Sequence, residues 1–253
     1  MRSRYPYRPT ASDFSYSFGP GPITSVIKAL IIANVVAFLG TWIAGERVDI
    51  IRFLGLSPRE VFEGFQVWRV LTYQFLHAGL FHLLFNMLAL WMFGVELERR
   101  WGSQYFLKYY MVCSTGAAVT TLLLSLIPTF GYMYDPVTVG ASGAIYGVLL
   151  AFGMYFPTRP ILMFFVFPVP AKYAVMIMGG IALLSSFDGA GGTAHTAHLG
   201  GLVAGYLFLR GGNLHLLSEI QYRVLKWRIN RSKRRFDVYQ GGRRADDVDR
   251  RVH

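Results

Sequence analysis

The stretch GASGAIYG, residues 140–147, places Ser142 at the start of an apolar segment, between residues with little or no side chain. A serine hydroxyl is a weak nucleophile until a base accepts its proton. The best candidate for that base lies downstream in AHLGGLVAG, residues 197–205, and a third polar piece lies upstream in HLLFN, residues 82–86. We expect three helices to bring these pieces together around one buried site.

The composition places the chain among membrane proteins. Of its 253 residues, 53% are hydrophobic and 15% are charged, whereas a soluble globular domain carries about 25% charged residues. A single cysteine, Cys113, excludes an internal disulfide and a metal site built from several cysteines. We therefore expect a polytopic membrane protein with no metal ion and no other cofactor.

The net charge of +11 has two possible explanations. A basic chain can bind nucleic acid, but here 11 of the 25 lysines and arginines lie after residue 211. A basic tail on a membrane protein is typical of the cytoplasmic side and of contact with anionic lipid. We expect anionic lipid, and no nucleic acid, as the partner of this tail. Apolar side chains share one helical face over residues 217–227, which indicates a helix lying on the inner leaflet.

Six apolar segments are predicted to be transmembrane helices of an all-α bundle. They cover residues 23–44, 81–97, 104–127, 142–156, 171–186 and 194–209. The first is too long for a signal peptide, and further spans follow it. Residues 45–80 are too polar to span and rich in aromatic side chains, so we expect an interfacial loop between helices 1 and 2. Four prolines in residues 157–170 predict a turn with an extended apolar piece.

The predicted membrane domain covers residues 23–210. A flexible N-terminal segment, residues 1–22, precedes it, and the basic tail, residues 211–253, follows it. Because the chain is short and carries no added domain, we expect a bacterial inner membrane.

Basic residues sort the loops into two sides. Lysine and arginine occur in the turns at 96–108 and 157–172 and are missing from the loops at 128–141 and 187–193. The positive-inside rule then places both termini in the cytoplasm. The arginines of residues 45–80 depart from this pattern, and we attribute the departure to the interfacial structure of that segment.

Two interpretations of Ser142 compete. The simpler one is a helix N-cap or a small packing residue. The alternative rests on its neighbours, because Gly143, Gly147 and Ala151 recur every four residues and make one helix face nearly flat. The segment at 197–205 repeats this device with an alanine and two glycines, one of them Gly201. Two such faces allow close approach of backbones, which a serine–histidine hydrogen bond requires.

The start of a helix adds a second chemical argument. The first-turn N–H groups have no partner within the helix, and the helix dipole is positive there. Ser142 would therefore come with backbone donors suited to an oxyanion. The flanking Gly140 and Gly143 would let a substrate backbone come near.

His198 is the preferred base, and His195, three residues earlier, is its rival. Intramembrane ionisable groups are usually functional, although a histidine there can simply bond a carbonyl. We prefer His198 because it adjoins the small-residue face. Tyr146 lies one turn after Ser142 and is predicted to stack on the imidazole, the alternative being an ordinary core tyrosine.

His82 and Asn86 lie four residues apart on one helix face. A metal site needs a third ligand, and no HExxH pattern or carboxylate accompanies them. Asparagine is a poor metal ligand and a good amide donor, so we favour donors to a developing oxyanion. Glu98 and Arg100 are predicted to be supporting residues that bond loop carbonyls and hold the interfacial segment against the second helix.

Taken together, the motifs resemble those of the rhomboid intramembrane serine proteases. In the order of that family, over about residues 24–210, the matching pieces are Trp68–Arg69 with Thr72–His77, His82-x-x-x-Asn86, Glu98-x-Arg100, Gly140-x-Ser142–Gly143 with Tyr146, and Ala197–His198-x-x-Gly201-x-x-x-Gly205. Each motif alone is weak, but five in order are a specific signal.

The resemblance implies a six-helix core and a Ser142–His198 dyad without an acid. It also implies an oxyanion hole from the Ser142 N–H, Asn86 and His82, and substrates that are transmembrane helices of membrane proteins, cut near the outer face. The sequence thus predicts an intramembrane serine endopeptidase. The competing class is a binding protein or transporter that uses the same polar pocket without covalent chemistry.

Overall fold

The computed structural model describes residues 19–45, 49–163, 166–187, 192–211 and 226. The chain divides into two units, Met1–Leu209 and Arg210–His253. The helix predicted over 217–227 and most of the tail lie outside the described residues. The three-part division at residues 22 and 210 stays a prediction.

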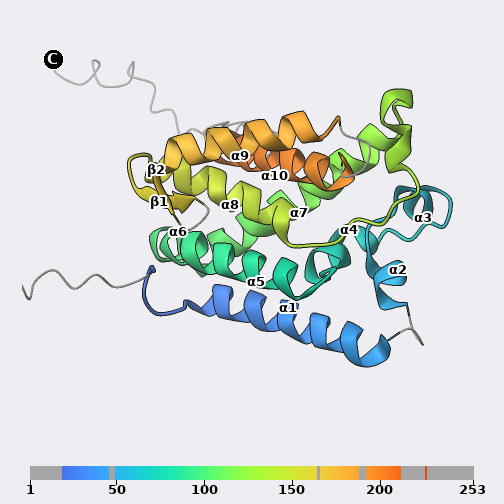
Figure 1. Ribbon diagram of the computed structural model, residues 1–253, viewed down its shortest axis with the longest axis horizontal. Coiled ribbons are helices and arrows are strands. Elements are labelled where there is room, and N and C mark those ends of the chain that lie inside the picture. Colours follow the sequence, from blue (N-terminus) through green and yellow to red (C-terminus); the bar gives the residue numbers. More distant parts are fainter. Residues whose placement is uncertain (1–18, 46–48, 164–165, 188–191, 212–225, 227–253) are drawn as a thin grey trace, which may run out of the picture. The chain divides into compact units, whose positions relative to one another are not determined.

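The first unit is mainly helical, and its longer helices run side by side (Figure 1). Their bounds are α1 Ser25–Ala44, α5 Leu80–Ala89, α6 Val95–Trp101, α7 Ser103–Ser125, α8 Ser142–Tyr155, α9 Ala171–Ser185 and α10 Gly192–Gly211. A π-helical turn, Leu90–Gly94, joins α5 to α6, so the second predicted helix is one continuous helix, Leu80–Trp101. All six predicted helices are present, with ends shifted by at most a few residues.

Three of these helices are long and apolar enough to cross a bilayer. They are Ser25–Ala44, Leu80–Trp101 and Ser103–Ser125. The helices α8 and α9 are also apolar but shorter, and 14 residues of α8 extend only about 21 Å at 1.5 Å per residue. Several membrane helices are therefore present among the described residues, while the count of six spans stays a prediction.

The segment between α1 and α5 folds into short helices rather than a plain loop. These are α2 Ile50–Leu54, α3 Pro58–Phe62 and α4 Arg69–Thr72, followed by a 3₁₀ turn, Tyr73–Phe75. Local sequence explains α3, because Ser57 caps it by accepting a hydrogen bond from the Glu60 N–H and Pro58 occupies its first turn. Its position in the membrane interface stays a prediction.

The proline-rich connection after α8 is a β-hairpin. The strands β1 Pro160–Met163 and β2 Phe167–Pro170 pair antiparallel, with Pro160 opposite Pro170. The extended piece expected from the prolines is thus confirmed, and pairing with a second strand is the addition. The hairpin lies at one end of the bundle and α2–α4 lie at the other (Figure 1).

Small residues bring α8 and α10 into backbone contact. A Cβ built on Gly201 would lie 1.8 Å from the carbonyl oxygen of Gly143, and one built on Gly205 would lie 3.3 Å from the Cα of Gly147. A Cβ at position 201 cannot lie 1.8 Å from an oxygen atom. The helices therefore approach this closely only because residues 201 and 205 are glycines. The two flat faces predicted from the sequence therefore meet.

Candidate active site

Ser142 is the first residue of α8, and the backbone before it is held in place. The N–H of Gly140 donates a 3.0 Å hydrogen bond to the carbonyl of Tyr73. Gly140 has a φ of +124°, a conformation that is open to glycine and strained for other residues. A Cβ at Gly140 would lie 2.9 Å from the imidazole of His82 and 3.6 Å from Ser142 Oγ. This glycine therefore lets the His82 ring lie close to the serine.

Ser142 and His198 meet across the interface of α8 and α10. The distance between Ser142 Oγ and His198 Nε2 is 2.8 Å, which is a hydrogen-bond distance. It depends on the backbone contact at Gly201, three residues after the histidine. A side chain there would push α10 away from α8 and separate the two groups.

Tyr146 fixes the orientation of the imidazole. Its ring stacks on His198 with centroids 4.2 Å apart and planes 7° from parallel, the arrangement expected from the sequence. His195 approaches the His198 ring edge-on, with centroids 5.7 Å apart. Of the two histidines, His198 is therefore the one bonded to the serine, and His195 is a neighbour of that ring.

The Nδ1 atom of His198, the ring nitrogen that does not face Ser142, is buried and makes no hydrogen bond to another described residue. A catalytic triad would place an acidic side chain there. Among the described residues the arrangement is thus a serine–histidine pair.

His82 presents one ring nitrogen towards Gly140. Its Nδ1 accepts a 3.4 Å hydrogen bond from the Ala78 N–H. In a neutral imidazole the other nitrogen then carries the proton. The Nε2–H group therefore lies beside the turn that carries Ser142, where it can donate to an oxyanion.

Asn86 lies one turn further along α5 and is 7% exposed. Its side-chain amide donates a 2.7 Å hydrogen bond to the His82 carbonyl. An amide nitrogen carries two hydrogens, so one remains for a ligand. The two side chains predicted as oxyanion donors thus lie on the same helix face as expected.

His77 is the buried residue whose place sequence reasoning missed. It is 1% exposed, and neither ring nitrogen has a hydrogen-bond partner among the described residues. Its ring lies edge-on to His82, with centroids 4.9 Å apart. Burial, and secondly His82, lower the pKa of His77 to about 4, so it is neutral at pH 7. The five-residue spacing of His77 and His82 is the sequence signal for this contact.

Despite these histidines, no group of three or more metal-ligating side chains occurs in the part of the chain that the structure describes.

Glu98 and Arg100 do not hold the interfacial segment, so the predicted contact is wrong. The Glu98 carboxylate accepts hydrogen bonds from the N–H groups of Val26 and Ile27, each at 3.1 Å. It also accepts from three hydroxyl groups, those of Thr24, Ser25 and Ser103. A carboxylate bonds donors and not carbonyls, and the unpaired donors at the start of α1 are where it is needed.

Arg100 contacts aromatic rings instead of loop carbonyls. Its guanidinium carbon lies 5.1 Å from the ring centre of Tyr155 and 5.9 Å from that of Phe156. These are cation–π distances. Arg100 therefore ties α6 to the end of α8.

Arg69 holds the interfacial segment together. It is 2% exposed and donates hydrogen bonds of 2.6 Å to the carbonyls of Arg52 and Gly55. Thr72 adds a 2.6 Å bond to the carbonyl of Leu54. These residues connect α4 to the end of α2, so this motif supports Tyr73, the residue that anchors Gly140.

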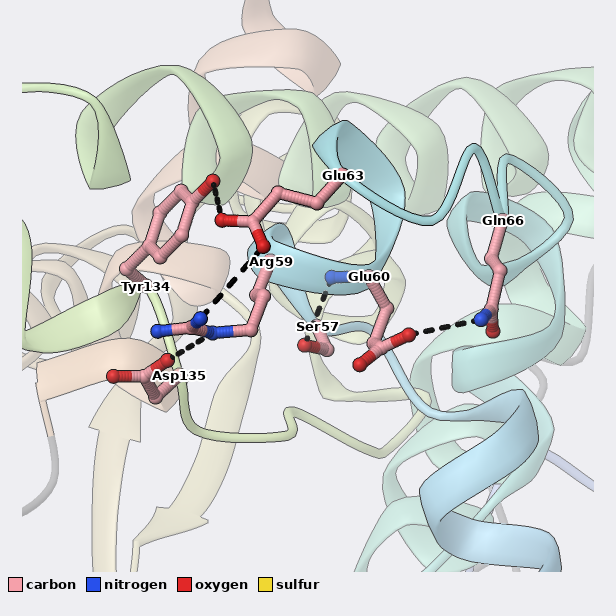
Figure 2. A network of polar contacts seen from close by, with 7 residues as sticks. All are labelled: Ser57, Arg59, Glu60, Glu63, Gln66, Tyr134 and Asp135. Carbon is pink, nitrogen blue, oxygen red and sulfur yellow. Dashed lines mark hydrogen bonds and ion pairs between the residues drawn. The ribbon is translucent and has the colours of Figure 1, made fainter.

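The interfacial segment also binds the loop that leads to Ser142. Leu56 and Thr138 form a two-bond β-bridge, with N–O distances of 2.9 and 2.8 Å. Figure 2 shows side-chain contacts between the same two segments, in which Arg59 Nε lies 2.6 Å from Asp135 Oδ1 and the Tyr134 hydroxyl donates to Glu63 at 3.0 Å. The Asp135 carboxylate raises the pKa of Arg59.

The Arg59, Glu63 and Asp135 side chains are exposed, and exposed ion pairs contribute little to stability. The backbone bridge is therefore the stronger part of this connection. Through it, the segment at 50–75 determines where the turn before Ser142 lies.

The chain is similar to known proteins of one family. A family model described as "Rhomboid domain" matches residues 64–211. The rhomboid protease GlpG of Haemophilus influenzae is 30% identical over 190 residues, which cover 74% of this chain and 89% of that protein. RHOMBOID-like protein 4 of Arabidopsis thaliana is 29% identical, over 74% of this chain and 44% of its own length.

A further relative, the mitochondrial rhomboid protein 1 of Saccharomyces cerevisiae, is 35% identical over 53% of this chain and 38% of its own length. The chain thus spans less than half of the plant and yeast relatives and most of the bacterial one. All the elements that carry the site, from α4 to α10, fall within the matched region.

Proposed function

This chain belongs to the rhomboid family, and on that premise we propose that it is an intramembrane serine endopeptidase with Ser142 as nucleophile and His198 as base. The observation that carries the proposal is the 2.8 Å distance between Ser142 Oγ and His198 Nε2. A packing serine does not need a stacked histidine at hydrogen-bond distance.

The proposed reaction has two halves. Ser142 Oγ attacks a peptide carbonyl while His198 Nε2 takes the hydroxyl proton, and the tetrahedral intermediate collapses to an ester as His198 returns that proton to the leaving amine. Water then attacks the ester, with His198 again accepting a proton and passing it to Ser142 Oγ. Tyr146 keeps the imidazole plane in position through both halves.

The oxyanion is proposed to lie between the start of α8 and the facing side of α5. The Ser142 N–H, the His82 Nε2–H and the second hydrogen of the Asn86 amide are the donors. Because they are in place before reaction, little reorganisation is needed when charge develops.

The substrates are proposed to be transmembrane helices, cleaved near the outer face. Both termini are proposed to be cytoplasmic, with the basic tail on anionic lipid. The chain is an integral membrane protein, and we propose a bacterial inner membrane although relatives include plant and mitochondrial proteins.

The experiment that tests this function is labelling of the purified protein with a fluorophosphonate. We expect a covalent adduct on Ser142 and none after Ser142→Ala. Ser125→Ala is the matched control, since that buried serine on α7 bonds the Leu122 carbonyl. An unlabelled wild-type protein, or labelling that survives Ser142→Ala, would favour the binding or transport class instead.

A further inference from the structure

The connection between α8 and α9 has a basic residue at each end and apolar residues between them. Arg159 and Lys172 are the two basic residues, and every residue of the sequence from Pro160 to Ala171 is apolar. The Ala171 N–H donates a 2.8 Å hydrogen bond to the Arg159 carbonyl, and the Lys172 N–H donates one of 3.1 Å to the carbonyl of Pro157. The two basic residues are therefore neighbours at the base of the β1–β2 hairpin.

The hairpin is apolar on both of its sides. Successive residues of a strand point alternately to the two sides of a sheet. Ile161 is buried and Val169 packs against the core, so one side faces the bundle. Leu162 points to the other side and is 47% exposed, while Val166 and Phe167, at the start of β2, are 66% and 61% exposed. The outer side of a hairpin that faced water would carry polar side chains.

Prolines remove hydrogen-bond donors from the edges of the hairpin. In an antiparallel pair, opposite residues alternate between pairs that exchange two hydrogen bonds and pairs whose N–H and C=O groups point outward. Pro160 lies opposite Pro170, and Leu162 lies opposite Pro168. These pairs are of the outward kind, because proline has no N–H to exchange. Three of these four outward positions are thus proline, and Leu162 alone among them has an outward N–H.

Missing edge donors suit a lipid surface better than a partner strand. An unpaired N–H is costly in lipid, and three of the four that could arise here are absent. A second copy of the chain could not readily extend the sheet, since an added strand needs N–H donors along the edge. The edge carbonyls still need donors, and water supplies them at the boundary between head groups and acyl chains.

The hairpin lies beside a membrane helix and not beyond its end. At the base of the hairpin, Arg159 Nη1 donates to Glu96 Oε2. Met163, at the end of β1, lines a cavity together with Ala89 and Met92, which lie one to two turns before Glu96 in the helix that contains α5. The strand therefore runs from Glu96 towards the apolar part of that helix.

We propose that this hairpin is inserted into the lipid leaflet on the side of Arg159 and Lys172, at the boundary between head groups and acyl chains. Leu162, Val166 and Phe167 contact the acyl chains, while the two basic side chains lie at the level of the lipid phosphates. Long basic side chains at such a boundary extend their charge into the head groups. The hairpin thereby anchors the connection between α8 and α9 in the bilayer.

The test is the accessibility of a nitroxide label on the full chain in lipid vesicles. Val166→Cys and Phe167→Cys are labelled separately, and the wild-type protein is the background control because its single cysteine, Cys113, is buried. Val36→Cys is the matched lipid reference, since Val36 lies in the middle of the apolar helix α1 and is 62% exposed. Asp135→Cys is the water reference, at a charged position whose side chain is 69% exposed.

Oxygen dissolves preferentially in the bilayer and a nickel chelate in water, so the ratio of the two accessibilities identifies the medium around each label. We expect both hairpin labels to give an oxygen-to-nickel ratio above that of Asp135→Cys and near that of Val36→Cys. A ratio equal to that of Asp135→Cys would place the hairpin in water. Protection from both reagents would show that protein covers it, as in a contact between two copies, and either result would overturn the proposal.

A second measurement gives the depth of the hairpin. A fluorophore on Val166→Cys is exposed to phospholipids that carry bromine either near the glycerol end or near the methyl end of the acyl chain. We expect stronger quenching by the shallow bromine at Val166→Cys and by the deep bromine at Val36→Cys. Stronger quenching of Val166→Cys by the deep bromine would overturn the placement at the boundary. Neither measurement needs proteolysis, so the outcome is separate from that of the proposed peptidase.

Discussion

Two helix N-termini in this molecule are treated in opposite ways. At α1, the Glu98 carboxylate accepts the N–H groups of Val26 and Ile27 and three neighbouring hydroxyls. At α8, Ala141 precedes the helix and no side chain caps it. Both ends carry unpaired donors and a positive dipole. At α1 a fixed carboxylate uses them, and at α8 they stay available to a ligand.

The comparison shows which groups use the free N–H donors at each helix start. A carboxylate at the start of α8 would satisfy the helix and block an oxyanion. Instead the first residue of the helix carries a hydroxyl that faces His198, and the turn before it is fixed by hydrogen bonds to Tyr73 and by the Leu56–Thr138 bridge. The helix end that stays open for chemistry is held through the backbone before it, whereas the start of α1 is held by the Glu98 carboxylate of α6, which bonds the helix end directly.

The largest effect should follow from removing the side chain of Ser142 at the start of α8, or that of His198, which bonds it. Ser142→Ala and His198→Ala should each reduce cleavage of a transmembrane substrate to background, and the double variant should be no worse, since groups that act as a unit are non-additive. The measurement is turnover in detergent, with thermal unfolding as the control for folding. Substantial cleavage by either single variant would remove the dyad from the mechanism.

Removing one donor at the same end should have an intermediate effect. Asn86→Ala should lower turnover by about 10²–10³-fold, because one side-chain donor to the oxyanion is lost while the backbone donor remains. Fluorophosphonate labelling should persist more slowly, as nucleophile and base are intact. Full turnover would exclude Asn86 from the site. If the loss of turnover is accompanied by a large drop in melting temperature, the role of Asn86 is in packing instead.

At the capped end, the effect should be on stability and not on chemistry. Glu98→Gln should lower the free energy of unfolding by about 1–3 kcal/mol, because hydrogen bonds to a charged acceptor become weaker bonds to a neutral one. Denaturation and turnover of the surviving folded protein are the two measurements. A loss of turnover without a loss of stability would contradict the structural role of this carboxylate.

The smallest effect is expected beside the dyad. His195→Ala should retain turnover within a few-fold, since His195 contacts the edge of the His198 ring and not Ser142. Its stability should be checked by thermal unfolding, because the variant leaves space next to His198. Loss of cleavage as complete as in His198→Ala would make His195 part of the catalytic unit.

The same two helix ends show the reach of sequence reasoning. Apolar length, prolines and glycine spacing predicted all six helices and the flat faces of α8 and α10, because these patterns depend on neighbours a few residues apart. The Ser142–His198 pair was predicted from the glycines around each residue. Glu98 was predicted to be a supporting residue, and the partner predicted for it was wrong, since nothing near it in the chain points to the start of α1.

What the sequence determined by itself was the class of protein, its helices and the residues able to do chemistry. Only the tertiary structure decided which of these residues meet: His77 against His82, Glu98 under α1, and Glu96 beside Arg159. The physical reason is the distance along the chain over which each kind of interaction acts. Helix formation depends on hydrogen bonds and side-chain patterns within a few residues, whereas these contacts join separate elements whose approach depends on the packing of the whole bundle.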